Sequence, residues 1–237
     1  MKLKMKKIVL FLLLLISSFS QAQPKAIIGE TDYNFWINLP KQEILDNKPP
    51  VIIFLHGRSL SGTDINRVKR YGILRAIEKG RNIPAIIVAP QLPFGPWNPD
   101  KINQVLEYVQ KNYEIDSTRI YVTGMSLGSY GTMKFVSKYH DKIAAAVSIC
   151  GGGEEADACN LSEVPIKVIH GDKDFIVRLS ESQKIVNAIR KCNKNAPLEF
   201  QIVKGGTHGS VENFYREDAI YEWLFKHSKA NMSELNL

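Results

Sequence analysis

The chain has 237 residues, of which 44% are hydrophobic and 23% charged, a composition typical of a globular protein and unlike that of a disordered one. The formal net charge is +7, but four lysines lie within the first seven residues, so the rest of the chain carries only +3. This weak charge does not indicate a nucleic-acid partner. The length allows one sizeable α/β domain.

The N-terminal segment is predicted to be a secretory signal peptide. Four lysines precede the apolar run Ile8–Ile16, which is too short to span a bilayer. Small residues at the −3 and −1 positions predict cleavage after Ala22, with Gln23 as the alternative, so that residues 1–22 are the leader and residues 23–237 the mature domain. We therefore expect a secreted or periplasmic protein with no stable membrane anchor. The alternative is a retained N-terminal anchor.

The mature chain alternates apolar β-branched runs with segments of helical periodicity. Strands are predicted over residues 33–39, 51–55, 85–89, 120–123, 144–149, 166–169 and 200–203. This alternation predicts a single-domain α/β fold, with a mostly parallel sheet covered by helices on both faces. In such a sheet, catalytic groups lie at the carboxyl ends of the strands.

Four helices are predicted between and after these strands. Asn98 is the expected N-cap of the first, with Pro99 at its first position. A second helix is expected from Leu127 to about Tyr139. Ser180 and Gln183 resemble a capping box that opens a third helix, and a last helix surrounds Trp223. The stretch from Cys150 to Val164 is too short for the helical cap found in many related folds, so we expect no large cap domain.

The strand over residues 120–123 leads into a Gly-x-Ser-x-Gly sequence at Gly124–Gly128, and a predicted helix follows. Strand, tight turn and helix form the context of a nucleophile elbow, in which the serine hydroxyl stands clear of the sheet. The helix then directs backbone N–H groups at developing negative charge. Ser126 is the expected nucleophile.

A serine nucleophile needs a base and an acid that orients the base. Of the histidines after Ser126, His208 lies in a glycine-rich loop beyond the last strand, from which it could approach the serine. Asp174 lies in the loop after the preceding strand and is the expected acid, with Asp172 as its competitor. We expect Asp172 to cap backbone amides in the turn.

Two further sets of site residues are expected on loops at the same sheet edge. The backbone amides of Arg58, which follows a buried strand and a glycine, and of Leu127 are predicted to form the oxyanion hole. Gln91 and Trp97 are predicted to line the acyl or alcohol site, because they follow a strand end in a proline-rich loop. The alternative for Trp97 is that it only anchors this loop. His56 is expected to brace its loop.

The three cysteines, Cys150, Cys159 and Cys192, show no metal-ligand spacing. The sequence favours three buried free thiols. If two of them bond in an oxidising compartment, the expected pair is Cys150 and Cys159, which bracket a short loop.

Taken together, these motifs resemble the phospholipase/carboxylesterase-like α/β-hydrolases, including bacterial predicted peptidases and esterases related to dienelactone hydrolases. The resemblance is carried by the segments 54–57, 89–91, 124–128, 149–153, 170–174 and 207–209. It implies a triad of Ser126, Asp174 and His208. The sequence departs from the family in having Ser129 and Arg58 where smaller residues are common, and Gly209 where an aspartate often follows the histidine.

The resemblance and the residues together predict an exported serine hydrolase that cleaves carboxylic esters through an acyl-enzyme, without a metal or organic cofactor. The expected substrate is a small-molecule or carbohydrate-linked ester. One alternative is a serine peptidase of the same fold. The other is a catalytically silent domain that binds glycans.

Overall fold

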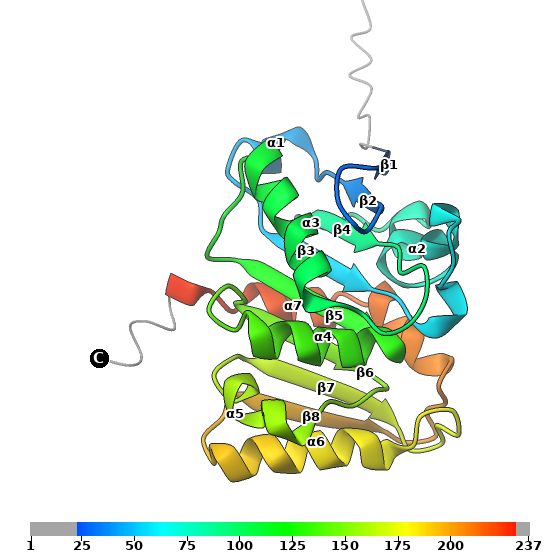
Figure 1. Cartoon of the computed structure of the whole chain (residues 1–237), viewed down its shortest axis with the longest axis vertical. Helices are drawn as coiled ribbons and strands as arrows, with labels where there is room; N and C mark the ends of the chain where they lie inside the picture. Colours follow the sequence, from blue (N-terminus) through cyan, green and yellow to red (C-terminus); the bar gives the residue numbers. More distant parts are fainter. Residues whose placement is uncertain (1–22, 231–237) are drawn as a thin grey trace, which may run out of the picture.

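The computed structural model describes residues 23–230, so the predicted leader lies outside the described residues. An eight-stranded sheet with the order β1-β2-β4-β3-β5-β6-β7-β8 forms the centre of the domain (Figure 1). The strands are β1 (Lys25–Ile27), β2 (Phe35–Asn38), β3 (Val51–Leu55), β4 (Ile86–Pro90), β5 (Ile120–Met125), β6 (Ala145–Ile149), β7 (Ile166–Gly171) and β8 (Leu198–Val203). From β4 to β8 all neighbouring strands are parallel, whereas β1 and β2 add antiparallel pairings at one edge.

The helices connect the strands and cover the sheet. The α-helices are α1 (Gln42–Leu45), α2 (Gly72–Glu78), α3 (Pro99–Asn112), α4 (Leu127–Lys138), α5 (Ala158–Leu161), α6 (Leu179–Cys192) and α7 (Ala219–Phe225). Short 3₁₀ helices are η1 (Arg58–Leu60), η2 (Ile65–Arg70), η3 (Glu155–Asp157) and η4 (Ser210–Arg216). The predicted α/β class and mostly parallel sheet are confirmed.

The side chains of β3 show why the sheet is covered on both faces. Val51, Ile53 and Leu55 belong to the core shared with α3, α4, α5 and α6. Ile52 and Phe54 point the other way, into the core shared with α2 and α7. Successive strand side chains alternate between faces, so this wholly apolar strand needs helices on both sides. Figure 1 shows α3, α4 and α6 in front of the sheet.

Each of the seven predicted strands is present, with ends shifted by a few residues. Strand β1 and the short helices α1, α2 and α5 were not predicted, and the three residues of β1 are too few for a pattern. The N-cap of α3 is confirmed, because Asn98 Oδ1 accepts a hydrogen bond from the amide of Asp100 at 2.8 Å. The capping box at Ser180 was wrong. Helix α6 starts at Leu179, with extended Arg178 before it and no side-chain cap.

The cysteine prediction was also wrong. Cys159 in α5 and Cys192 at the end of α6 form a disulfide, with their Cα atoms 5.3 Å apart. Cys150 remains a buried free thiol at the end of β6. Local spacing misled because α5 packs against α6, which brings together two residues that are 33 positions apart in the sequence.

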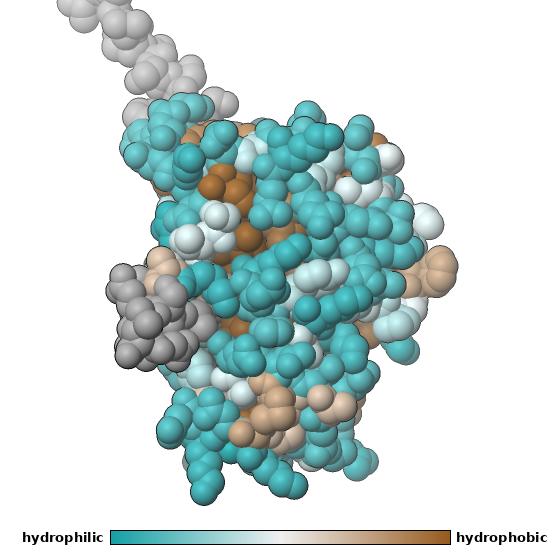
Figure 2. Space-filling view, turned by 60° about the vertical axis from the view of Figure 1, so that its left-hand side comes forward, coloured by the Kyte–Doolittle hydropathy of each residue, from teal (hydrophilic) through white to brown (hydrophobic). Residues whose placement is uncertain are grey.

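The surface of the domain is mostly polar on the side seen in Figure 2, where apolar residues show only in small separate areas. Among residues 23–230, no helix combines the length and apolar character needed to cross a bilayer.

Candidate active site

Ser126 lies at the junction of β5 and α4, in a strained backbone conformation with φ 57° and ψ −121°. The strain is accommodated by two glycines. A β-carbon on Gly128 would lie 1.8 Å from the Leu55 carbonyl oxygen, and one on Gly124 would lie 2.2 Å from the Gly128 carbonyl oxygen. Only glycine fits such close backbone approaches. A strained serine between a strand and a helix is the geometry of a nucleophile elbow.

A cavity of about 500 Å³ opens beside Ser126. Its wall also contains His208 from the loop after β8, so two of the three predicted triad residues share one cavity. The other lining residues are Gly57, Arg58, Ser59, Tyr71, Met125, Ile176, Gly209 and Glu212. The predicted nucleophile and base thus come together from segments more than 80 positions apart in the sequence.

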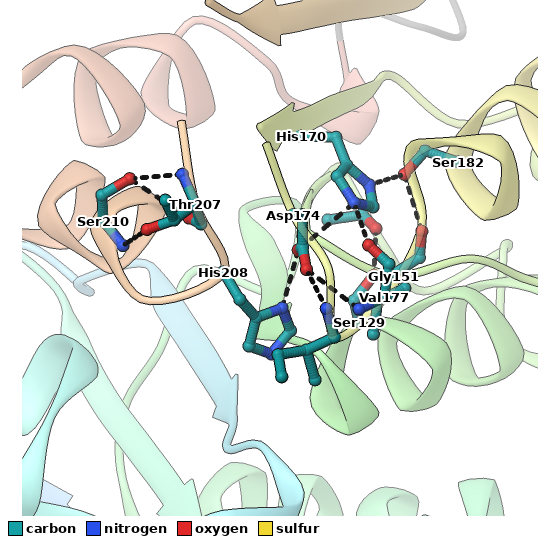
Figure 3. Close-up of polar contacts among 11 residues, drawn as sticks. Ser129, Gly151, His170, Asp174, Val177, Ser182, Thr207, His208 and Ser210 are labelled. Carbon is teal, nitrogen blue, oxygen red and sulfur yellow. Dashed lines mark hydrogen bonds and ion pairs between the residues drawn. The ribbon is translucent and has the colours of Figure 1, made fainter. Parts of the chain in front are cut away.

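Asp174 and His208 form a direct hydrogen-bonded pair (Figure 3). His208 Nδ1 lies 2.7 Å from Asp174 Oδ2, and the carboxylate is buried, whereas the imidazole is 20% exposed. The other carboxylate oxygen, Oδ1, accepts hydrogen bonds from the amides of Ile176 and Val177, each at 2.9 Å. These contacts leave Asp174 Oδ2 to hold the ring of His208.

A second histidine, His170, stands behind the carboxylate. Its Nε2 lies 2.9 Å from the Val177 carbonyl oxygen and 3.4 Å from Asp174 Oδ2. Its Nδ1 lies 2.7 Å from Ser182 Oγ, which donates to the Gly151 carbonyl at 2.6 Å. His170 therefore ties the Asp174 loop to α6 and to the end of β6 (Figure 3).

Asp172 has the place expected of a turn residue. Its Oδ1 accepts a hydrogen bond from the amide of Gly205 at 2.7 Å, so it joins the turn after β7 to the turn after β8. It has no hydrogen bond or ion pair with His208 among the described residues. The geometry pairs Asp174, not Asp172, with the histidine.

Both amides predicted for an oxyanion hole stand at the start of a helical segment. Arg58 is the first residue of η1 and Leu127 the first residue of α4. The first amides of a helix have no acceptor within it, so they are free to bind an anion. A β-carbon on Gly57 would lie 3.3 Å from Ser126 Cβ, which places the Arg58 loop against the serine.

Tyr71 holds this loop and was not singled out from the sequence. The Gly57 amide donates to Tyr71 Oη at 3.0 Å, and Ser59 Oγ lies 3.1 Å from the same atom. Burial raises the pKa of Tyr71, which keeps its hydroxyl protonated. Its position after a basic 3₁₀ helix gives no local sequence signal, so only the fold reveals the contact.

Gln91 and Trp97 do not line the cavity beside Ser126. Gln91 is buried and donates through Nε2 to the carbonyls of Leu60 and Gly62, at 2.8 and 2.7 Å. It is therefore a loop brace, and the prediction that it lines the acyl or alcohol site was wrong.

Trp97 is also buried, and its indole N–H donates to the His56 carbonyl at 3.2 Å. It packs edge-on against Tyr33 and borders a separate small pocket with Leu127 and Tyr130. These contacts fit the alternative in which Trp97 anchors its loop.

His56 stabilises the loops that follow β3 and β4. Its Nδ1 lies 2.8 Å from the Gly57 carbonyl oxygen, and its Nε2 accepts from the Leu92 amide at 3.0 Å. Burial lowers the pKa of His56 to about 4, so the ring is neutral and fits one donor and one acceptor role.

The residues that could hold a metal are Cys150, Asp174 and His208, whose ligand atoms all lie within 4.8 Å of one another. Burial raises the pKa of the Cys150 thiol to about 12, so it is protonated at neutral pH. His208 Nδ1 and Asp174 Oδ2 are already joined by their hydrogen bond. The cluster is therefore better suited to moving a proton than to binding a cation.

Ser129, where smaller residues were expected from the family resemblance, has a structural explanation. Its hydroxyl bonds to Ser148 Oγ in the buried space between α4 and β6. A β-carbon on neighbouring Gly151 would lie 2.3 Å from Ser129 Oγ, so the serine is accommodated by the glycine opposite it. This departure leaves the surroundings of Ser126 intact.

Comparisons with known proteins agree with this geometry. A sequence model described as Phospholipase/Carboxylesterase matches residues 98–227, which include Ser126, Asp174 and His208. A solved thermostable esterase superposes with a TM-score of 0.72 and 26% identity, over 87% of this chain and 63% of the other.

Two further proteins resemble this chain in fold or in part of the sequence. Acylaminoacyl peptidase from Pyrococcus horikoshii shares the fold, with a TM-score of 0.63, 16% identity and coverage of 90% of this chain and 43% of the peptidase. A bifunctional acetylxylan esterase/xylanase from Neocallimastix patriciarum is 27% identical over 89 residues, which are 38% of this chain but only 13% of that enzyme. The match spans a small part of the larger enzyme.

Proposed function

Because the chain belongs to the phospholipase/carboxylesterase family and is an esterase-like hydrolase of the α/β-hydrolase fold, we propose that it is an exported serine esterase. The observation that carries this proposal is the buried Asp174 carboxylate, 2.7 Å from His208 Nδ1, with His208 and Ser126 lining one cavity. Base, orienting acid and nucleophile are the three groups that acyl transfer by serine requires.

In the proposed mechanism, Ser126 Oγ attacks the ester carbonyl carbon while His208 Nε2 takes the hydroxyl proton. Asp174 keeps the ring in the tautomer with hydrogen on Nδ1 and stabilises the imidazolium that forms. The backbone amides of Arg58 and Leu127 bind the oxyanion of the tetrahedral intermediate. Collapse of the intermediate breaks the ester C–O bond, and the alcohol leaves with the proton from His208.

The acyl-enzyme is then hydrolysed by the same groups. His208 takes a proton from a water molecule, which attacks the acyl carbon, and the second tetrahedral intermediate releases a carboxylic acid and returns the proton to Ser126. These steps use water and protein groups. Because Asp174 is buried, its interaction with the imidazolium is stronger than it would be in solvent.

Export is supported by two independent features. Residues 1–22 have the composition of a secretory leader. The disulfide between Cys159 and Cys192 fits an oxidising compartment such as the periplasm or the exterior.

Ester rather than amide substrates are favoured by the relatives. The thermostable esterase is the most similar of the structures described above, and the sequence relative is named as an acetylxylan esterase. The acylaminoacyl peptidase shares only the fold, at 16% identity. We therefore propose a small-molecule or carbohydrate-linked ester as substrate and treat amide cleavage as an outcome for the experiment to test.

The test compares wild-type protein with Ser126→Ala on 4-nitrophenyl esters, acetylated sugars, feruloyl esters and a matched peptide anilide. Ser126→Ala should lower ester kcat by about 10³-fold or more while the protein keeps its fold, as judged by circular dichroism. Ser59→Ala is the matched control, because it removes another hydroxyl from the same cavity, and it should cost less than tenfold. Ester activity of Ser126→Ala within tenfold of wild type would refute the mechanism. Faster cleavage of the anilide than of every ester would make the protein a peptidase.

A further inference from the structure

Arg58 contributes more to the cavity than its backbone amide. Its side chain is exposed and lines the cavity that contains Ser126. Within the part of the chain that the structure describes, its guanidinium forms no ion pair and no hydrogen bond. The cavity therefore has a positive charge in its wall that no protein group neutralises.

The acidic groups near the cavity are already engaged. Glu212 Oε1 accepts a hydrogen bond from the Gly72 amide at 2.8 Å, and its Oε2 lies 3.1 Å from Arg216 Nη2. Asp174 is paired with His208. Neither carboxylate pairs with Arg58, so its guanidinium is free to pair with an anionic group of a bound molecule.

The segment that begins with Arg58 strengthens the positive field on this side. Residues 58–70 include four basic residues and a single acid, Asp64. Asp64 Oδ1 accepts the amide of Asn66 as the cap of η2, at 2.9 Å. In the described part of the chain, none of the four basic residues pairs with a carboxylate, and Arg67 instead donates to the Ser59 carbonyl at 2.9 Å. With four basic residues and one acid, the segment carries a net positive charge, which favours the approach of anions to this side of the molecule.

The rest of the cavity wall explains why a cation there would matter. The wall combines apolar Met125 and Ile176 and side-chain-free glycines with polar residues, and most of its exposed surface is apolar. The polar residues besides Arg58 are Ser59, Tyr71, Ser126, His208 and Glu212. An anionic group entering a largely apolar cavity loses hydration, which is unfavourable unless a partner of opposite charge replaces the water. The planar guanidinium of arginine can bind both oxygens of a carboxylate at once.

The position of Arg58 is also fixed by its neighbours. Gly57 before it and Ser59 after it both hydrogen-bond to Tyr71 Oη. These bonds hold the backbone of the loop, so the exposed Arg58 side chain starts beside the amide that we assign to the oxyanion hole and is free to pair with a bound molecule. A residue whose backbone is fixed in this way can discriminate between substrates rather than merely attract ions.

We propose that this cavity selects esters that carry a carboxylate, and that Arg58 pairs with that carboxylate when the ester is bound. This inference rests on the proposed esterase function and names its substrate class. The carboxylate can belong to the acyl part, as in a half-ester of a dicarboxylic acid, or to the alcohol part, as in an ester of a hydroxy acid.

The experiment uses two pairs of matched substrates. For the acyl part, kcat/KM is measured with 4-nitrophenyl hydrogen adipate and 4-nitrophenyl hexanoate, which have the same acyl length and differ in the terminal charge. For the alcohol part, the pair is 4-carboxyphenyl acetate and 4-carbamoylphenyl acetate. The quantity compared is the ratio of kcat/KM for the anionic ester to that for its neutral partner.

We expect Arg58→Gln to lower this ratio at least tenfold in one of the two pairs, and Arg58→Lys to retain much of it because the charge remains. Arg70→Gln is the control, since Arg70 lies in the same basic segment but does not line the cavity, and its ratio should stay within twofold of wild type. Raising the ionic strength should lower kcat/KM for the preferred anionic ester and leave that for its neutral partner nearly constant.

Equal ratios for wild type and Arg58→Gln in both pairs would overturn the proposal, even if Ser126→Ala showed the serine mechanism to be correct. If no ester is cleaved, the esterase function fails, and calorimetry still tests the anion site. In that case adipate should bind the Ser126→Ala protein at least tenfold more tightly than it binds the Ser126→Ala/Arg58→Gln double variant. Equal binding would refute the site.

Discussion

The two sides of the cavity differ in how their charges are arranged. On the side of β7 and β8, the Asp174 carboxylate is buried and accepts two backbone amides and one histidine nitrogen. On the side of β3, Arg58 is exposed, has no ion-pair partner in the described region, and heads a segment rich in basic residues. One side is fully hydrogen-bonded around a single acid, and the other offers an unneutralised cation.

This difference suggests a division of labour. A proton-transfer pair works best when its geometry is held by surrounding bonds, because misplacement raises the barrier. A group that selects substrates has to be free until the substrate arrives. We infer that the Asp174 side transfers the proton, whereas on the other side the Arg58 side chain selects the substrate beside the amide that binds the oxyanion, so the two sides should respond differently to substitution.

The largest effect should come from the Asp174 side. Asp174→Asn replaces one acceptor oxygen by an amide nitrogen, which disturbs either the His208 ring or the two loop amides, and kcat should fall by roughly 10²–10⁴-fold. Asp172→Asn is the control, because Asp172 bonds only to the turn at Gly205, and it should lower the melting temperature with little effect on kcat. The reverse pattern, measured by ester kinetics and thermal unfolding, would transfer the orienting role to Asp172.

A smaller effect is expected from the buried His56, next to the Arg58 loop, because its titration makes the free energy of unfolding depend on pH. The folded protein keeps His56 neutral down to a pKa of about 4, whereas the unfolded chain takes up its proton near the ordinary value of 6.5. The unfolded state therefore binds more protons between these values, and stability falls as the pH is lowered through this range. From pH 7 to pH 5, His56 should account for a loss of about 2 kcal/mol in the free energy of unfolding.

Urea unfolding at both pH values checks this expectation. His56→Gln should be less stable than wild type at pH 7 but lose less stability on acidification. Identical pH responses for wild type and His56→Gln would contradict the assignment of the acid sensitivity to this histidine.

The smallest effect is expected from Tyr71, which holds the Arg58 loop in position but takes no direct part in the reaction. Tyr71→Phe removes the oxygen that accepts the Gly57 amide, so the loop that presents the Arg58 amide should loosen and kcat for a neutral ester should fall about fivefold to tenfold. Tyr139→Phe is the control. Tyr139 directly follows α4, at the end away from Ser126, and its hydroxyl bonds to Asp100, so its loss should leave kcat near wild type. A Tyr71→Phe enzyme with wild-type kcat would show that the loop holds its shape without this bond.

The fold could be read from the sequence wherever a pattern was local. Continuous apolar runs such as Val51–Leu55 mark buried parallel strands, and Asn98 before Pro99 marks a helix start. Ser126 was recognisable because strand, glycines and helix are adjacent in the chain. The pairing of Asp174 with His208 could be predicted because each lies in a loop after a predicted strand, and parallel strands bring such loops to one edge.

Contacts between distant segments could not be read in this way. The partner of Cys159 depends on how α6 packs against α5, and the contact of Tyr71 with Gly57 depends on how η2 packs against η1. The direction of the Gln91 side chain could not be predicted, and two alternatives stayed open for Trp97, because a position after a strand end does not tell whether a side chain faces the cavity or the interior. Packing decides that direction, and a single sequence carries little information about it.

The most direct test of the central claim is labelling of the intact protein by a fluorophosphonate, which reacts with a serine only when a neighbouring base and an oxyanion hole activate it. We predict one label per molecule, located on Ser126 by peptide mass spectrometry, with loss of ester hydrolysis in proportion to labelling and no label in Asp174→Asn over the same period. A protein that hydrolyses esters while Ser126 stays unlabelled, or that carries the label on another residue, would contradict the proposed active site.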